Sequence, residues 1–141
     1  MHDIELYLER LRQNDLKVTP KRREILRLFL ESGAYHSPLD IHRYLTKRFA
    51  RTGLPTVYRI LHEFSQIGLL KLYYHPDRQL YYYFCDMSGT HHHHFFCIDC
   101  HRVQTVLYCE FDALKKHVAE TLSAEVTDHH LEIEGQCSRC R

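Results

Sequence analysis

Several features are missing from this 141-residue chain, and each absence narrows its class. No apolar run approaches the ~18 residues of a membrane span, so we expect no transmembrane helix. The N-terminus, MHDIELYLERLRQND, is charged and amphipathic, unlike a signal peptide. The His-Glu-x-x-His motif of zinc hydrolases is also absent, and we expect no enzyme. The sequence predicts a cytoplasmic protein whose six cysteines are thiols or metal ligands.

The net charge is small, +1, but it is unequally divided along the chain. Residues 1–84 carry fourteen Lys and Arg against nine Asp and Glu, whereas residues 85–141 carry five against nine. A basic half followed by an acidic half predicts a polyanion-binding module joined to a module with another role. We therefore expect two domains, 1–84 and 85–141.

The basic half has the pattern of helices followed by a hairpin. Apolar residues recur at helical spacing in four segments up to Gly68, and two of these begin with a capping residue and a proline, Thr19-Pro20 and Ser37-Pro38. Residues 69–84, LLKLYYHPDRQLYYYF, contain two strand-like runs around a Pro-Asp turn. This order predicts a winged helix-turn-helix.

In a winged helix, the last helix before the hairpin, here within 54–68, enters the major groove of DNA with its first residues at the base edges. Tyr58 would contact a thymine methyl, Arg59 a guanine edge or a phosphate, and Thr56 a phosphate. Further phosphate contacts would come from flanking basic residues, Lys17, Lys21, Arg22, Arg23 and Arg51. The alternative is a solvated helical bundle with scattered cations.

Two Cys-x-x-Cys motifs stand in the acidic half, at Cys97 and Cys100 and at Cys137 and Cys140. Two chelating dithiols from distant segments predict a tetrahedral four-thiolate site for structural Zn(II). Such a site stabilises a small domain by on the order of 10 kcal/mol. The alternative, a pair of redox dithiols, is disfavoured because neither motif opens a helix after a βαβ strand.

The segments around these motifs predict a small α/β domain. Residues 102–109 and 125–135 are strand-like, and residues 109–124 form an amphipathic helix. We expect the apolar face of this helix to point inward, namely Phe111, Leu114, Val118 and Leu122. Exposed strands in such a domain suit a symmetric dimer interface. The fold class expected for the whole chain is α+β.

Four consecutive histidines, His91 to His94, precede the first cysteine motif. An affinity tag is disfavoured because the run leads directly into Phe95-Phe96-Cys97 rather than into a linker. In an extended strand, successive side chains point to opposite faces. We therefore expect His91 and His93 to serve one site, and His92 and His94 to serve another.

The motifs LPTVYRIL, HHHHFFCIDCHRV and CSRC, in this order and with a hairpin after the first, resemble those of the ferric uptake regulator family. The resemblance runs from about Leu16 to the C-terminus. It implies a homodimeric, metal-dependent transcriptional repressor whose winged helices bind an AT-rich palindrome in double-stranded DNA. It also implies that Lys17 contacts the minor groove and that Tyr58 and Arg59 lie on the recognition helix.

The resemblance implies three metal sites. The four cysteines match the structural zinc site. A regulatory site at the hinge would use His36, Cys85 or Asp86, and His92 with His94. A second regulatory or stabilising site would use the set His91, His93, Asp112 and His129.

Two departures from the family pattern bear on the regulatory metal. Thr105 stands where iron and peroxide sensors carry a carboxylate, and the soft thiol of Cys85 stands where a carboxylate is common. Thiolate with imidazoles favours tetrahedral Zn(II) over six-coordinate Fe(II). The chain thus resembles the zinc-responsive members, with His75 as an alternative to His36. Asp86 would instead supply an oxygen donor. The alternative function is therefore an iron- or peroxide-responsive regulator that uses Fe(II) or Mn(II).

Overall fold

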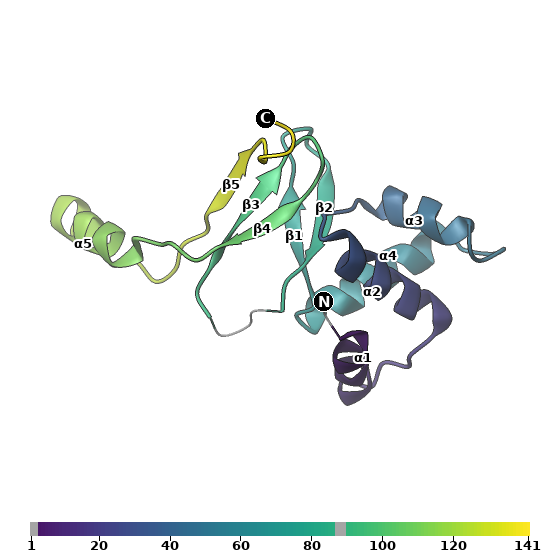
Figure 1. Ribbon diagram of the computed structural model, residues 1–141. Helices are drawn as coiled ribbons and strands as arrows, with labels where there is room; N and C mark the ends of the chain where they lie inside the picture. The colour runs from purple at the N-terminus through teal and green to yellow at the C-terminus, as the bar shows by residue number, and fades with distance from the viewer. Residues whose placement is uncertain (1–2, 87–89) are drawn as a thin grey trace.

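A computed structural model describes residues 3–86 and 90–141, and it places four helices and a hairpin ahead of a second sheet and a fifth helix (Figure 1). The helices are α1 Ile4–Gln13, α2 Pro20–Ser32, α3 Pro38–Thr46, α4 Leu54–Gln66 and α5 Phe111–Leu122. The strands are β1 Leu70–Tyr74, β2 Leu80–Phe84, β3 His93–Cys97, β4 Val103–Val106 and β5 Glu132–Gly135. This is the α+β arrangement that the sequence predicts.

The helices of the N-terminal half begin where their capping residues predict. The Thr19 side chain accepts a hydrogen bond from the Arg22 backbone N–H at the start of α2. Ser37 and Asp40 form a reciprocal capping box at the start of α3. Helix α2 ends at Gly33, whose φ of 58° lies in the left-handed region that favours glycine. Local sequence therefore sets these boundaries.

One core holds the helices and the wing together. The apolar faces of α1, α2, α3 and α4 pack on one another and on β1, with Leu8, Leu26, Leu45 and Leu61 completely buried. Strands β1 and β2 pair antiparallel from Leu70↔Phe84 to Tyr74↔Leu80. This is the winged helix predicted from the helix and hairpin pattern.

The second sheet has the strand order β4-β3-β5. Strand β3 pairs antiparallel with β4 and parallel with β5, with Cys97 opposite Gly135. The parallel pairing brings the C-terminal ends of β3 and β5 to the same edge of the sheet. The two cysteine motifs follow at this edge.

Aromatic side chains join the wing to the second sheet. The rings of Tyr73 in β1 and Phe96 in β3 are stacked, with centroids 3.9 Å apart. Tyr35, from the segment between α2 and α3, is completely buried and donates a hydrogen bond of 2.8 Å to the Cys97 carbonyl oxygen. Tyr73 donates another of 2.8 Å to Glu134. The helical half and the cysteine edge thus share one packed interface.

Helix α5 differs from the expectation that its apolar face points inward. None of its residues is buried, and it projects away from the helical half (Figure 1). Leu114 and Leu122 are 47% and 71% exposed. Within residues 3–86 and 90–141, no other helix or strand buries this face. No helix in the described part of the chain is long and apolar enough to span a membrane.

Candidate metal centres and nucleic-acid interface

The four cysteines converge at the edge where β3 and β5 end. The Sγ atoms of Cys97, Cys100, Cys137 and Cys140 all lie within 4.8 Å of one another. The first motif forms a tight turn, in which the His101 N–H donates to the Cys97 carbonyl oxygen at 3.1 Å. In the second, the Cys140 N–H donates to the Cys137 carbonyl oxygen at 2.9 Å. Four sulfurs without a carboxylate among them fit a tetrahedral zinc site.

The backbone around the motifs favours a thiolate at Cys97. Burial alone opposes ionisation of this thiol. Backbone N–H groups of Cys100, Cys137 and Asp99 more than compensate for burial, and the pKa of Cys97 is lowered to about 6. The pKa of Cys137 is also lowered, mainly by the backbone N–H of Arg139. N–H groups that point at sulfur stabilise the form in which cysteine binds metals.

A second group lies where the wing meets the second sheet. Cys85 directly follows β2, and its Sγ atom is 3.1 Å from Nε2 of His92. His94 on β3 completes a set of three ligand atoms within 4.8 Å of one another. Cys85 and His94 are buried, and burial, followed by the nearby His92, lowers the pKa of His94 to about 4. His94 is therefore neutral at physiological pH, as a metal ligand must be.

Asp86 lies beside this second group but is engaged elsewhere. Its carboxylate accepts a hydrogen bond from the Tyr7 hydroxyl on α1. With Cys85, His94 and Thr105, it lines a cavity of about 210 Å³ between α2 and the second sheet. Burial and the Asp86 contact raise the pKa of Tyr7 to about 12. Asp86 is thus near the group without belonging to it.

Neither histidine expected as the further hinge ligand joins Cys85, His92 and His94. His36 pairs through its backbone with Tyr82 of β2, and its Nε2 atom lies 2.8 Å from Ser32 Oγ. His75 lies in the turn between β1 and β2, and Nδ1 is 3.1 Å from Asp77 Oδ1. The hairpin register separates this turn from Cys85 by the whole length of β2. The expectation that His75 reaches Cys85 is therefore corrected.

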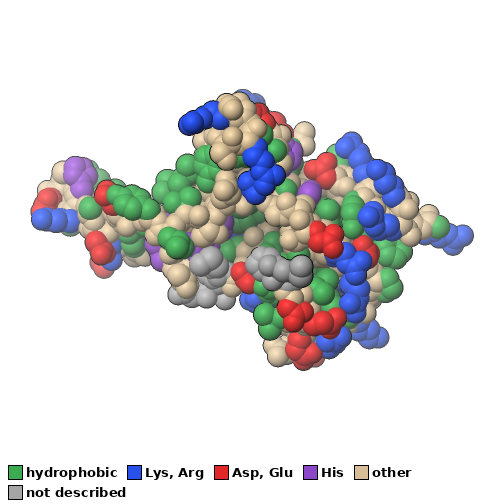
Figure 2. All heavy atoms as spheres, viewed as in Figure 1, with side chains coloured by type: hydrophobic (Ala, Val, Ile, Leu, Met, Phe, Trp, Pro, Cys, Tyr) green, Lys and Arg blue, Asp and Glu red, His purple; other side chains and the backbone are tan. Residues whose placement is uncertain are grey.

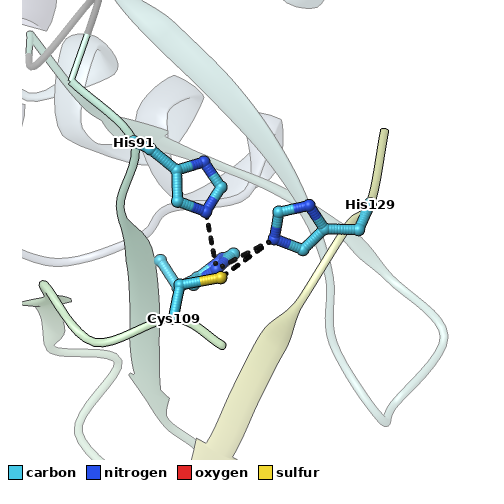
Figure 3. A group of neighbouring side chains, drawn as sticks. His91, Cys109 and His129 are labelled. Atoms are coloured by element: carbon cyan, nitrogen blue, oxygen red, sulfur yellow. Dashed lines mark hydrogen bonds between the residues drawn. The ribbon is translucent and has the colours of Figure 1, made fainter. Parts of the chain in front are cut away.

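A third group forms around His93, and Figure 3 labels three of its members, His91, Cys109 and His129. The Nε2 atom of His93 is 3.2 Å from Nε2 of His91 and 3.2 Å from Nε2 of His129. The Sγ atom of Cys109 is 3.3 Å from Nε2 of His129. These four ligand atoms all lie within 4.8 Å of one another. Burial, followed by His91 and His129, lowers the pKa of His93.

The structure brings Cys109, rather than Asp112, into the third group. Asp112 is an exposed residue in the first turn of α5. Cys109 is not among the residues predicted for this site, because the family resemblance points to Asp112. A thiol at the start of the predicted helix, residues 109–124, was the available signal. The alternation of the histidine run is as expected, with His91 and His93 in one group and His92 and His94 in the other.

The residues expected to contact DNA lie on the helical half, where Lys and Arg side chains gather (Figure 2). On α4, Tyr58 is 48% exposed, and the side chain of Arg59 is 65% exposed. Thr56 is half-buried beside a cavity between α2 and α4, which Arg59 also lines. Lys17 and Arg51 are exposed. Tyr58, Arg59, Lys17 and Arg51 thus reach solvent, and Arg59 Nε also lies 3.9 Å from Glu63 Oε1.

Three basic residues at the start of α2, unlike Lys17 and Arg51, are held by contacts to other parts of the protein. Arg22 donates to Glu63 at 2.8 Å and to the Lys17 carbonyl oxygen at 2.9 Å. Arg23 lies 3.4 Å from Glu5. Lys21 donates to the Arg51 carbonyl oxygen at 2.6 Å. These contacts fix the segments that flank α4.

Comparison with known proteins agrees with this architecture. Residues 13–134 match the Ferric uptake regulator family. The chain is 33% identical over 135 residues to the ferric uptake regulation protein of Neisseria gonorrhoeae, covering 95% of this chain and 92% of that protein. It is 26% identical over 140 residues to the peroxide-responsive repressor PerR of Staphylococcus epidermidis, covering 99% and 91%.

A solved structure extends the likeness to the whole fold. A zinc uptake regulator complexed with zinc and DNA superposes with a TM-score of 0.72, at 21% identity, covering 97% of this chain and 91% of that one. The family consists of metal-responsive regulators of transcription rather than enzymes. With the winged helix, the four-cysteine cluster and the family match over most of its length, the chain belongs to the ferric uptake regulator family.

Proposed function

We propose that the protein is a zinc-responsive transcriptional repressor that binds a palindromic operator as a homodimer. The observation that carries the choice of metal is the group of Cys85, His92 and His94. One thiolate and two imidazoles are donors that favour tetrahedral Zn(II) over six-coordinate Fe(II). The four cysteines would hold a separate structural zinc.

The position of this group supports a regulatory role. Cys85 follows the last wing strand, whereas His94 belongs to β3 of the second sheet. A cation shared by these residues would fix the angle between the winged helix and the second sheet. In a dimer, that angle sets the spacing of two recognition helices on a palindrome. Metal and DNA must then raise each other's affinity by the same factor.

The DNA-facing residues in this proposal are those of α4 and its surroundings. Tyr58 and Arg59 would meet base edges, and Thr56 and Arg51 would meet phosphates. Lys17 would enter the minor groove. Arg22 and Arg23, held by Glu63 and Glu5, would contribute to the basic surface while positioning the segment before α2.

Affinity for operator DNA, measured by fluorescence anisotropy in a metal-buffered solution, tests the proposal. The protein keeps its structural zinc throughout, and free Zn(II) is varied. We expect Zn(II) to tighten operator binding about 5- to 150-fold, the usual range of such coupling. Cys85→Ser and His94→Gln should abolish the response, whereas His117→Gln, an exposed position on α5, should retain it. Equal affinity with and without Zn(II) would exclude the proposal.

An iron- or peroxide-responsive regulator is the second candidate, and Asp86 is the observation that favours it. Its carboxylate lines the same cavity as Cys85 and His94. Asp86 would supply the hard oxygen donor that Fe(II) or Mn(II) prefers. The test is whether Fe(II) or Mn(II) tightens operator binding in each variant. If this effect is lost in Asp86→Ala and kept in Cys85→Ser, the regulatory metal is iron or manganese rather than zinc.

Exposed apolar residues support the homodimer in this proposal. Leu107, Tyr108 and Leu131 are 71%, 68% and 48% exposed. Tyr108 and Leu131 line the same hollow as Leu114 of α5. Exposed apolar patches on a protein surface commonly mark a protein–protein interface. A second copy of the chain, related by twofold symmetry, would cover it with the same residues.

A further inference from the structure

The third group brings together donors from three separate parts of the chain. His93 begins β3 and His91 lies two residues before it, His129 precedes β5, and Cys109 lies two residues before α5 (Figure 3). His93 is buried, and Cys109 and His129 are partly buried. His91 is exposed, and the four ligand atoms all lie within 4.8 Å of one another. Segments that are distant in the sequence thus bring four metal-ligating atoms to one point.

The distances within the group match those of a tetrahedral site. Zinc–nitrogen bonds of about 2.0–2.1 Å place the nitrogens of a tetrahedral site about 3.3–3.4 Å apart. The nitrogen separations around His93 are both 3.2 Å, and the sulfur of Cys109 is 3.3 Å from His129 Nε2. Three of the six separations between the ligand atoms are therefore close to those of a tetrahedral ligand shell, and the others are no longer than 4.8 Å.

Hydrogen bonds alone satisfy this arrangement poorly. A single ring nitrogen either carries a proton and donates or has a lone pair and accepts. Nε2 of His93 nevertheless lies equally close to two other imidazole nitrogens. It cannot donate to one of them and accept from the other. A cation between the rings would use all of these lone pairs at once.

The fourth donor is a thiol. Asp112, the only carboxylate expected at this site, is exposed and lies outside the group. We propose that Cys109, with His91, His93 and His129, forms a three-nitrogen, one-sulfur site for one tetrahedral divalent cation of the zinc class. The thiolate makes the site selective against six-coordinate Fe(II) and Mn(II), which prefer oxygen donors.

Cys109 would also connect α5 to the second sheet. No residue of α5 is buried, so its packing does little to fix its orientation. Cys109 would anchor the start of α5 to β3 through the cation. The cation also lies beside the apolar hollow lined by Phe111, Leu114 and Leu131. Occupancy of the site therefore determines the orientation of α5 and the position of these apolar side chains relative to the sheet. The inference does not depend on DNA binding or on the metal that occupies the Cys85 group.

Cobalt(II) absorption tests the proposal in the full-length chain. The protein retains its structural zinc and carries Cys85→Ser, so that Cys109 is the only free thiol outside the four-cysteine site. We expect one Co(II) per chain with the intense visible bands of a tetrahedral ion and a near-ultraviolet thiolate charge-transfer band. Cys109→Ser should remove the charge-transfer band and weaken Co(II) binding by about 10-fold or more, since even loss of an outer-shell partner costs this much.

Asp112→Asn is the matched control and should leave the spectrum and the affinity unchanged. The reverse pattern, with the band kept in Cys109→Ser and Co(II) lost in Asp112→Asn, would overturn the proposal. A second measurement uses the wild-type chain and needs no folded variant. Zn(II) should protect Cys109 from alkylation by iodoacetamide, as followed by peptide mass spectrometry. Equal labelling of Cys109 with and without Zn(II) would also overturn it.

Discussion

His36 illustrates how burial of one side chain makes stability depend on pH. Its ring packs against Phe29, with centroids 5.3 Å apart, and burial lowers its pKa to about 4. An unfolded histidine has a pKa near 6.5, so between these values the unfolded chain binds the additional proton. The contribution of a neutral His36 to stability is therefore complete above pH 6.5 and is lost as pH falls towards 4.

We expect His36→Gln to be less sensitive to acid than the wild-type protein. The free energy of unfolding of the wild type should fall between pH 6.5 and 4.5 by on the order of 2 kcal/mol more than that of the variant. Urea denaturation at a series of pH values measures the difference. The contributions of the other titrating groups are the same in both proteins and cancel in the comparison. His62→Gln, which alters an exposed histidine, should behave as the wild type. Parallel pH profiles for wild type and His36→Gln would contradict the burial argument.

Histidine roles were only partly predictable from the sequence. The two-residue alternation of a strand was enough to divide His91–His94 between two groups. His75 was a reasonable candidate by its distance from Cys85 along the chain. Its exclusion depends on the hairpin register, which places the turn and Cys85 at opposite ends of β2. Spacing in sequence does not reveal which end of a strand a ligand occupies.

At the scale of single elements, α3 depends on its N-terminal cap. Ser37 is buried, and its Oγ accepts a hydrogen bond of 3.1 Å from the Asp40 backbone N–H. Ser37→Ala should lower the free energy of unfolding by about 1 kcal/mol, because the first turn would retain an unpaired donor. Thermal or urea unfolding measures this loss. Thr46→Ala, at an exposed position at the end of the same helix, should cost less; an equal loss would show that the cap is unimportant.

Helices with clear start and stop signals were the most predictable elements. The capping residues Thr19 and Ser37 fixed two boundaries, and the Pro-Asp turn fixed the hairpin. The segment 125–135 was less predictable, because only Glu132–Gly135 forms a strand. Residues 125–131 carry a β-branched Val126 and an apolar Leu131 among polar side chains, but no strand of the described residues pairs with them. Strand formation depends on a partner as well as on local preference.

For the whole molecule, the uncovered face of α5 predicts self-association. Leu122 is 71% exposed, and no residue of its helix is buried. Leu122→Glu should weaken dimerisation by roughly 10- to 100-fold, because the new carboxylate would be buried without a partner. Sedimentation equilibrium over a range of concentrations measures the change. Lys116→Gln alters the charge by the same amount on the opposite face and is the control.

An unchanged dimer in Leu122→Glu would place the interface elsewhere on the molecule.

The burial of α5 could not be predicted from one sequence, because the pattern of Leu114, Val118 and Leu122 shows that a face is apolar without showing what covers it. The contact of Cys109 with the histidine group could not be predicted from the sequence either. Its contact with His129 joins segments that no local pattern connects. The four-cysteine cluster was predictable because each motif is a chelating pair in itself.

Strand β3 contributes one donor to each of the three metal groups, since His93, His94 and Cys97 all belong to its five residues. A run of identical side chains carries no information about its own alignment: sliding β3 by one position would still present an imidazole on each face. Cys97 has no such substitute. The cysteine cluster therefore sets the alignment of the repetitive histidines, and a chain in which Cys97 could not join that cluster would lose the contact that distinguishes one pairing from the next.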